Sequence, residues 1–180
     1  MANGIDSLRN GSLSEMSLLD FSAQIMKEAT IDDFDPNERV RLRSIIKLRK
    51  GDKTLLELTD EELDKARQII KEDNGVLYPT VTGLLLIGKE DRLQRIIPTA
   101  KTSFQVLEGT KVRINEQIAK PLLATFSILE NYVKAWNPER EMEQGLFRIP
   151  IPEFSEDAFR EGIVNAFCHR DYSMLQMVRL

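Results

Sequence analysis

Residues 155–170 read SEDAFREGIVNAFCHR, and this spacing predicts a helix with two different faces. Ser155 suits the N-cap, and Phe154 and Phe159 have the spacing of a hydrophobic staple around it. At about 100° per residue, one face collects the apolar side chains and is predicted to face a core: Phe159, Ile163, Ala166 and Phe167. The opposite side carries a polar stripe with small residues in or beside it: Glu161, Asn165 and His169, with Ala158 and Gly162.

The polar stripe is suited to chemistry with a metal and water. A carboxylate such as Glu161 can orient or deprotonate a water molecule, and the amide oxygen of Asn165 is a hard ligand suited to Mg²⁺. Gly162 costs about 1 kcal/mol relative to Ala inside a helix, which a close approach by a ligand or a packed strand would explain. The same spacing also occurs on any solvent-facing helix, so spacing alone leaves both interpretations open.

The single Cys and the single His stand side by side at the end of this stretch. Neighbours on a helix point about 100° apart, which argues against a Cys–His nucleophile pair. Two adjacent ligands are also too few for a zinc site. We therefore expect Cys168 to be a small buried or half-buried filler and His169 to be a capping group near the helix C-terminus.

Composition limits the class of protein. With 180 residues, 42% hydrophobic and 30% charged, the chain can form one large domain or one domain plus a small helical piece. A net charge of −4 argues against capture of nucleic acid by overall charge, while allowing a local basic patch. No apolar run reaches bilayer length, so we expect no membrane partner, and a lone Cys fits a cytoplasmic protein.

The N-terminal part is predicted to be helical after a loose start at residues 1–16. One helix is expected at Leu18–Ala29. A second should begin after Asp35 and stop at Gly51. A third should begin at Thr59, where Glu62 completes a capping box, and close at Asn74-Gly75.

The second of these helices is the most basic segment, with Arg39, Arg41, Arg43 and Lys47. Nucleic-acid contact is one interpretation, and a solvated helix face is the other. We prefer the solvated face, because no aromatic residues are interleaved and no groove-reading motif is recognisable.

Beyond residue 75 the pattern changes to one typical of α/β structure, with α+β as the alternative. Strands are predicted at Val81–Gly88, Lys101–Leu107 and Met174–Leu180, with a further strand at 110–114 and an extended segment at 145–154. A long helix at Ile114–Ala135 contains Pro121, so it begins near that proline or kinks there. A chain that ends within a strand predicts a fragment of a longer protein, with an edge able to pair with itself.

Two blocks carry a family resemblance. FREGIVNAFCHRDYS, at 159–173, resembles the REAIVNALxHRDYS signature of bacterial and archaeal RecG-related proteins described as transcriptional regulators. TVTGLLLIGK, at 80–89, is similar to their LTxAGLLLFGK segment, in the same order and at similar spacing. LRNGSLSEMSLLDF, at 8–21, is similar to the end of the Schlafen/AlbA-type nucleic-acid-binding domain that precedes these blocks in the family.

The resemblance implies an organisation and a site. Residues 1–17 would end an upstream AlbA-type domain, 18–75 would be a helical linker segment, and 76–180 would begin an ATPase-like α/β sandwich of the gyrase, MutL and histidine-kinase type. The helix at about Glu156–Arg170 would carry its N box, with Glu161 as the catalytic residue that activates water. Asn165 would bind Mg²⁺, with Gly162 and His169 beside the nucleotide. Arg170 and Asp171 match signature positions to which we assign no role.

The match to the ATPase pattern is incomplete. The glycine-rich adenine pocket and phosphate lid of that fold do not occur before Leu180, so this chain holds half of a nucleotide site at most. The first hypothesis is thus a fragment of a DNA-binding transcriptional regulator whose intact form binds ATP and Mg²⁺, with DNA held by domains outside it. The alternative is a non-catalytic dimerisation or connector module that forms a homodimer. We expect no measurable ATP hydrolysis by this chain.

Overall fold

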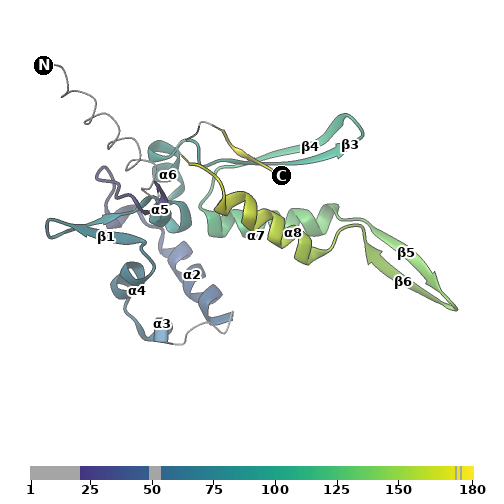
Figure 1. The fold of residues 1–180 in the computed structure, drawn as a ribbon, viewed down its shortest axis with the longest axis horizontal. Helices are drawn as coiled ribbons and strands as arrows, with labels where there is room; N and C mark the ends of the chain where they lie inside the picture. Colours follow the sequence, from purple (N-terminus) through teal and green to yellow (C-terminus); the bar gives the residue numbers. More distant parts are fainter. Residues whose placement is uncertain (1–20, 49–53, 173, 175) are drawn as a thin grey trace, which may run out of the picture.

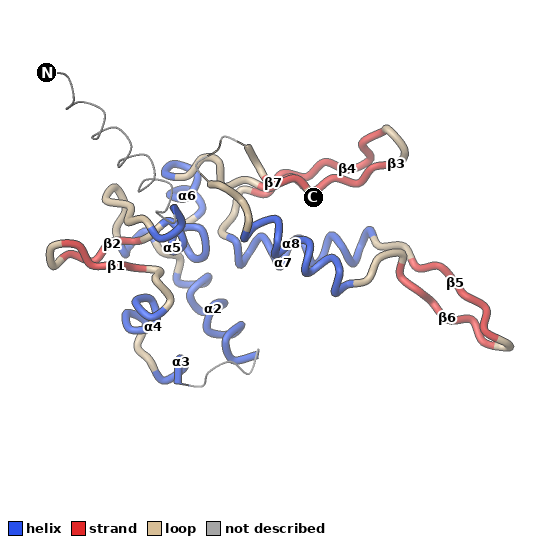
Figure 2. The backbone as a smooth tube through the Cα atoms, in the orientation of Figure 1, coloured by secondary structure: helices blue, strands red, loops and turns tan. Residues whose placement is uncertain are grey.

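Helices and small sheets surround two apolar cores in the computed structural model, which describes residues 21–48, 54–172, 174 and 176–180 (Figures 1 and 2). Figure 1 shows three hairpins that project from the helical body. The mixed α/β class predicted from the sequence is confirmed. The predicted loose residues 1–16, the AlbA-type segment 1–17 and the helix stop at Gly51 lie outside the described residues.

The part up to residue 100 contains mainly short helices and one hairpin. Its elements are η1 (Phe21–Ala23), η2 (Ile31–Asp33), α2 (Pro36–Leu48), α3 (Thr54–Glu57), α4 (Asp60–Ala66), β1 (Ile70–Asp73), β2 (Val76–Pro79), α5 (Val81–Ile87) and α6 (Glu90–Ile96). Two of the predicted helix starts are confirmed, those after Asp35 and Thr59. The N–H of Asn37 donates to the Asp35 carboxylate at 2.8 Å ahead of α2, and Thr59 and Glu62 form the capping box of α4.

Three predictions for this part are wrong. The strand at Val81–Gly88 is helix α5, whose N-cap Thr80 accepts the N–H of Gly83 at 3.0 Å. The third helix ends at Ala66, and Asn74-Gly75 is the turn of the β1–β2 hairpin, with φ of 51° and 79°. The described portion of Leu18–Ala29 holds only the short turn η1.

The part after residue 100 combines a three-stranded sheet, two helices and a second hairpin. Its elements are β3 (Thr102–Glu108), β4 (Lys111–Ile118), α7 (Leu122–Trp136), β5 (Glu139–Gln144), β6 (Phe147–Pro152), α8 (Glu156–Cys168) and β7 (Val178–Arg179). The sheet order is β4-β3-β7, with β3 antiparallel to β4 and parallel to β7. The strands predicted at 101–107, 110–114 and 145–154 are confirmed as β3, β4 and β6.

Of the two alternatives raised by Pro121, a helix start near this proline is confirmed: α7 begins at Leu122 with Pro121 at the N-cap, and residues 111–118 pair with β3 instead. One boundary differs from prediction. The strand expected at Met174–Leu180 is limited to Val178–Arg179 among the described residues. The predicted division at residues 75 and 76 falls within the β1–β2 hairpin and stays a prediction.

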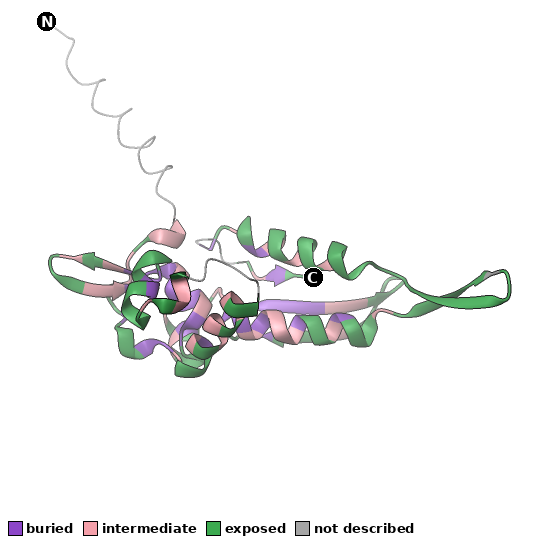
Figure 3. Cartoon of the chain, turned by 90° about the horizontal axis from the view of Figure 1, so that it is seen from below, coloured by how far each residue is buried: buried purple, intermediate pink, exposed green. Residues whose placement is uncertain are grey.

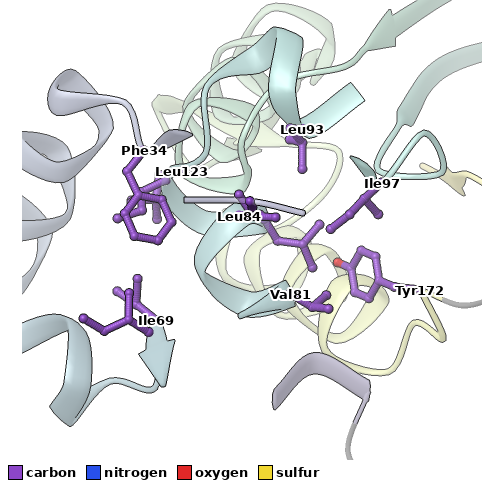
Figure 4. Packing of buried hydrophobic residues seen from close by; sticks show 12 residues of the cluster. Phe34, Ile69, Val81, Leu84, Leu93, Ile97, Leu123 and Tyr172 are labelled. Atoms are coloured by element: carbon purple, nitrogen blue, oxygen red, sulfur yellow. The ribbon is translucent and has the colours of Figure 1, made fainter. Parts of the chain in front are cut away.

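The two cores meet around α7. The first core gathers side chains of α5, α6 and their neighbours, and it includes Leu123 of α7 and Tyr172 from the far end of the chain (Figure 4). The second core lies between the sheet and helices α7 and α8, with Phe104, Leu129 and Phe167 among its buried members. Bilayer crossing requires a long apolar helix, and no helix in the described ranges has both properties.

Candidate functional site

Helix α8 is held by one face only. The four side chains predicted to face a core do pack in the second core: Phe159, Ile163, Ala166 and Phe167. Phe167 meets Phe126 of α7 edge to face with ring centroids 5.0 Å apart, and Phe154 packs on Phe159 at 5.4 Å as the predicted staple. Ser155 occupies the N-cap, although its side chain makes no capping hydrogen bond.

The opposite face of α8 carries the predicted polar stripe and is open to solvent (Figure 3). Glu161, Gly162, Asn165 and His169 are all exposed. Glu161 and Asn165 are one helical turn apart, a spacing that puts Cβ atoms about 6 Å from each other. Their side chains form no hydrogen bond or ion pair with any residue that the structure describes. The backbone N–H of His169 donates to the Asn165 carbonyl at 3.0 Å and ends the helix.

Gly162 adjoins open space. A Cβ atom added at this position would meet no described atom within 4 Å, apart from the helix's own backbone and its chain neighbours. No packed strand therefore explains the glycine within the described chain.

The donor set fits Mg²⁺ better than a softer metal. Glu161 offers carboxylate oxygens and Asn165 an amide oxygen, and Mg²⁺ takes a few hard oxygen ligands while keeping waters and phosphate oxygens for its other positions. Across the described ranges, no three or more His, Cys, Asp and Glu side chains are grouped closely enough to enclose a metal without such help. These residues could therefore hold Mg²⁺ only together with a ligand such as a phosphate.

The structure assigns roles to two residues that the sequence left without one. The half-buried guanidinium of Arg170 donates to the carbonyls of Thr99 and Gln176 and lies 4.5 Å from the centre of the Tyr172 ring. Burial lowers the pKa of Arg170 and raises the pKa of Tyr172. The Tyr172 hydroxyl donates to the Phe167 carbonyl at 3.4 Å. Together they hold residues 170–172 against Thr99 and the end of α8. The sequence shows a cation two residues before an aromatic side chain. It does not show that the cation, Arg170, binds the carbonyl of Thr99.

An open depression of about 320 Å³ adjoins this anchor, at the end of α8 that carries His169. Its lining includes Ala166, Arg170, Asp171, Gln176, Val178 and Arg179. The depression thus extends from the C-terminal end of the polar stripe to β7. Cys168 is exposed, so its predicted role as a buried filler is wrong, whereas the capping position of His169 is confirmed.

The basic residues of α2 are used mainly inside the chain. Arg39 pairs with Asp64 at 2.5 Å, and Arg43 donates to the Asp60 carboxylate and the Leu58 carbonyl, both at 2.8 Å. Arg41 donates to Ser127 of α7 at 2.9 Å and pairs with Glu38 at 3.1 Å. Lys47 is exposed and has no ion-pair partner among the described residues. Nucleic-acid contact by this helix stays a prediction, with three of its four cations already paired.

Comparison with known proteins gives a family and a solved structure. A family model described as a domain of unknown function (DUF8451) matches residues 12–103. The crystal structure of the DIP2311 protein from Corynebacterium diphtheriae is similar with a TM-score of 0.65 and 27% identity. The similarity covers 89% of this chain but 30% of that one, so the chain spans less than a third of the solved protein's length. No curated protein matches the chain significantly.

Proposed function

The chain belongs to the family described as a domain of unknown function (DUF8451), and we propose that α8, which follows the matched residues, forms one side of a Mg²⁺–nucleotide site. The observation that carries this proposal is the stripe of Glu161, Gly162 and Asn165. It faces solvent on a helix whose other face is packed, and its polar side chains have no partner in the described chain. The N-box resemblance suggests ATP as the nucleotide.

Each residue of the stripe has a chemical role in this proposal. The Asn165 amide oxygen would ligate Mg²⁺, which when bound neutralises phosphate charge. The Glu161 carboxylate would orient a water and accept its proton. Gly162 would leave the helix backbone free for close approach, and the His169 imidazole, one turn beyond Asn165, would donate a hydrogen bond to a phosphate oxygen.

For the longer protein we propose a cytoplasmic transcriptional regulator that binds DNA through other domains and binds ATP here. Because this chain supplies one side of the site, we expect weak nucleotide binding and no turnover from it alone.

The test is an NMR titration of the chain with ATP and Mg²⁺, which detects weak binding. We expect shifts concentrated on α8 and at least tenfold weaker binding by Asn165→Ala. The matched control is Asn131→Ala, which removes another exposed asparagine on α7 and should bind normally. Equal binding by the Asn165→Ala variant, or no shifts on α8 in the unaltered chain, would overturn the proposal. ATP turnover that disappears in Asn165→Ala would contradict the expected lack of hydrolysis.

The second candidate function is the connector or dimerisation module. A specific observation favours it, namely the exposed apolar hairpin between α7 and α8, which does not depend on nucleotide binding.

A further inference from the structure

Strands β5 and β6 form an arm that stands away from the body of the molecule (Figures 1 and 2). They pair only with each other among the described strands. Gly145, with φ of 66°, and Leu146 form the tight turn at the tip. At the base, the Asn137 side chain bonds both the N–H and the carbonyl of Phe154, at 3.0 and 2.8 Å. The arm is therefore fixed at its base and free along its length.

The pairing register sorts the arm into two chemically different faces. Met142 lies opposite Ile149, and alternation puts Phe147 and Ile151 on the same side as this pair. The other face carries Glu139, Glu141 and Glu143 opposite Pro152, Pro150 and Arg148. Arg148 bridges Glu141 at 3.3 Å and Glu143 at 3.5 Å across that face. The first face also carries Arg140, which lies opposite Ile151 and pairs with Glu153 at 3.1 Å near the base of the arm. The first face is thus mainly apolar and the second mainly acidic.

The apolar face is uncovered within this chain. Phe147 is 74% exposed, Met142 49% and Ile149 40%. An isolated two-stranded hairpin is marginally stable in water, and it gains stability when an apolar face is packed. Among the described residues, more than half of the large exposed apolar side chains lie between residues 136 and 164, so the exposure is concentrated on the arm and its base.

The edges of the arm are poor docking sites for another strand. Pro150 and Pro152 lack the N–H groups that an added strand would need along β6. Along β5, a second copy added edge to edge would bring rows of glutamates together. A partner should therefore pack on the apolar face.

We propose that a second copy of this chain covers the apolar face, with two arms packed face to face in opposite directions. Whole aromatic side chains bury roughly 150–250 Å², and on that scale the exposed parts of the apolar residues at 136–164 amount to roughly 800 Å² per copy. This is about the area that each partner contributes to a standard protein–protein interface. The acidic faces then point outward, where their charges stay apart.

The arm is also the right length for a self-complementary contact. Six residues of antiparallel strand span about 20 Å, so the tip of one arm reaches the base of the other. Leu146 and Phe147 at the tip would then cover the apolar side chains exposed at the base: Trp136, Phe154 and Val164. The Met142–Ile149 pair would lie near the two-fold axis.

The first test is the molar mass of the chain by light scattering over a range of concentrations. We expect twice the 20.7 kDa of one chain, and the monomer mass for Phe147→Glu. The matched control is Val112→Glu, which places the same charge on the exposed β3–β4 hairpin and should remain dimeric. The monomer mass for the unaltered chain at all concentrations would overturn the proposal. A dimer mass for Phe147→Glu would also overturn it.

The second test does not depend on a destabilising charge. In a Cys168→Ser background, Ile149→Cys on the apolar face should form a disulfide between copies on mild oxidation. Glu141→Cys, at a similar height on the acidic face, should not. Cross-linking of both variants or of neither would overturn the face-to-face arrangement, as would co-purification of a different protein that blocks the Ile149→Cys cross-link.

Discussion

Helices α5 and α8 both contain an interior glycine, but their surroundings are opposite. A Cβ on Gly83 of α5 would lie 2.2 Å from the Ile69 carbonyl oxygen, whereas a Cβ on Gly162 of α8 would meet nothing within 4 Å. The glycine of α5 is therefore required by its close approach to the backbone of Ile69, the residue before β1. The glycine of α8 has no such explanation in the described chain, and we propose that it belongs to a binding face.

Charged and polar side chains show the same contrast. The arginines of α2 are bound to Asp60, Asp64, Glu38 and Ser127, so they stabilise the helical part of the fold. Glu161 and Asn165 on α8 are exposed and unpaired among described residues. Three of the four basic side chains named on α2 therefore stabilise the fold, whereas the side chains of Glu161 and Asn165 stay available for binding.

The largest effect should come from Gly83→Ala. The added methyl group meets a backbone carbonyl that cannot move without shifting β1, and such overpacking costs about 1–3 kcal/mol or more. We expect the free energy of unfolding, measured in urea, to fall by at least about 2 kcal/mol. A loss below about 0.5 kcal/mol would show that Gly83 and the backbone of Ile69 are not in close contact.

The next effect is pH-dependent and belongs to Asp64. Burial, partly offset by Arg39, raises the pKa of the Asp64 carboxyl to about 6. The folded chain then binds more protons than the unfolded chain between about pH 4 and 6, so this contribution to stability is present below pH 4 and is lost as the pH rises through 6. The difference between a pKa of about 6 and the ordinary pKa of an aspartate corresponds to roughly 2–3 kcal/mol of stability.

The measurement compares the unaltered chain with Asp64→Asn by urea unfolding at pH 4 and pH 7. We expect the difference in the free energy of unfolding between the two proteins to change by about 2 kcal/mol from pH 4 to pH 7. The unaltered chain should lose more stability toward pH 7. Asp60 is present in both and acts in the other direction, because the hydrogen bond from Arg43 holds the pKa of Asp60 below its usual value. Parallel pH profiles would contradict the raised pKa of Asp64.

Local patterns predicted the elements that depend on local contacts. The starts of α2 and α4 follow from capping residues, and the two faces of α8 follow from apolar spacing. Helix α5 did not follow, because a seven-residue apolar run buried on all sides has no periodicity to separate helix from strand. Strand β4 was partly taken for helix because it is almost entirely exposed and lacks apolar alternation.

The candidate site divides in the same way. The stripe of Glu161 and Asn165 was predictable, since it needs only helical spacing. The anchor made by Arg170 was not, because its acceptor Thr99 is 71 residues away in the chain. The apolar face of the arm depends on the register between β5 and β6, which the sequence of β5 did not indicate.

A smaller effect, of opposite sign, is expected from Gly162→Ala. Replacing a helix-interior glycine by alanine gains up to about 1 kcal/mol when nothing obstructs the methyl group. We expect thermal unfolding to shift upward by a few degrees while nucleotide-induced NMR shifts on α8 weaken. A rise in stability with undiminished shifts would remove the backbone at Gly162 from the proposed binding face.

The smallest effect should be that of Lys47→Ala, which sharpens the contrast between α2 and α8. Lys47 is exposed and has no ion-pair partner in the described ranges, so its loss should change the free energy of unfolding by less than about 0.5 kcal/mol. Arg43→Ala, which loses bonds to Asp60 and Leu58, should cost more and serves as the control. If the unaltered chain binds DNA and Lys47→Ala abolishes this binding at unchanged stability, α2 is a nucleic-acid contact. If neither the unaltered chain nor the two variants bind DNA, the basic side chains of α2 do not form a nucleic-acid contact.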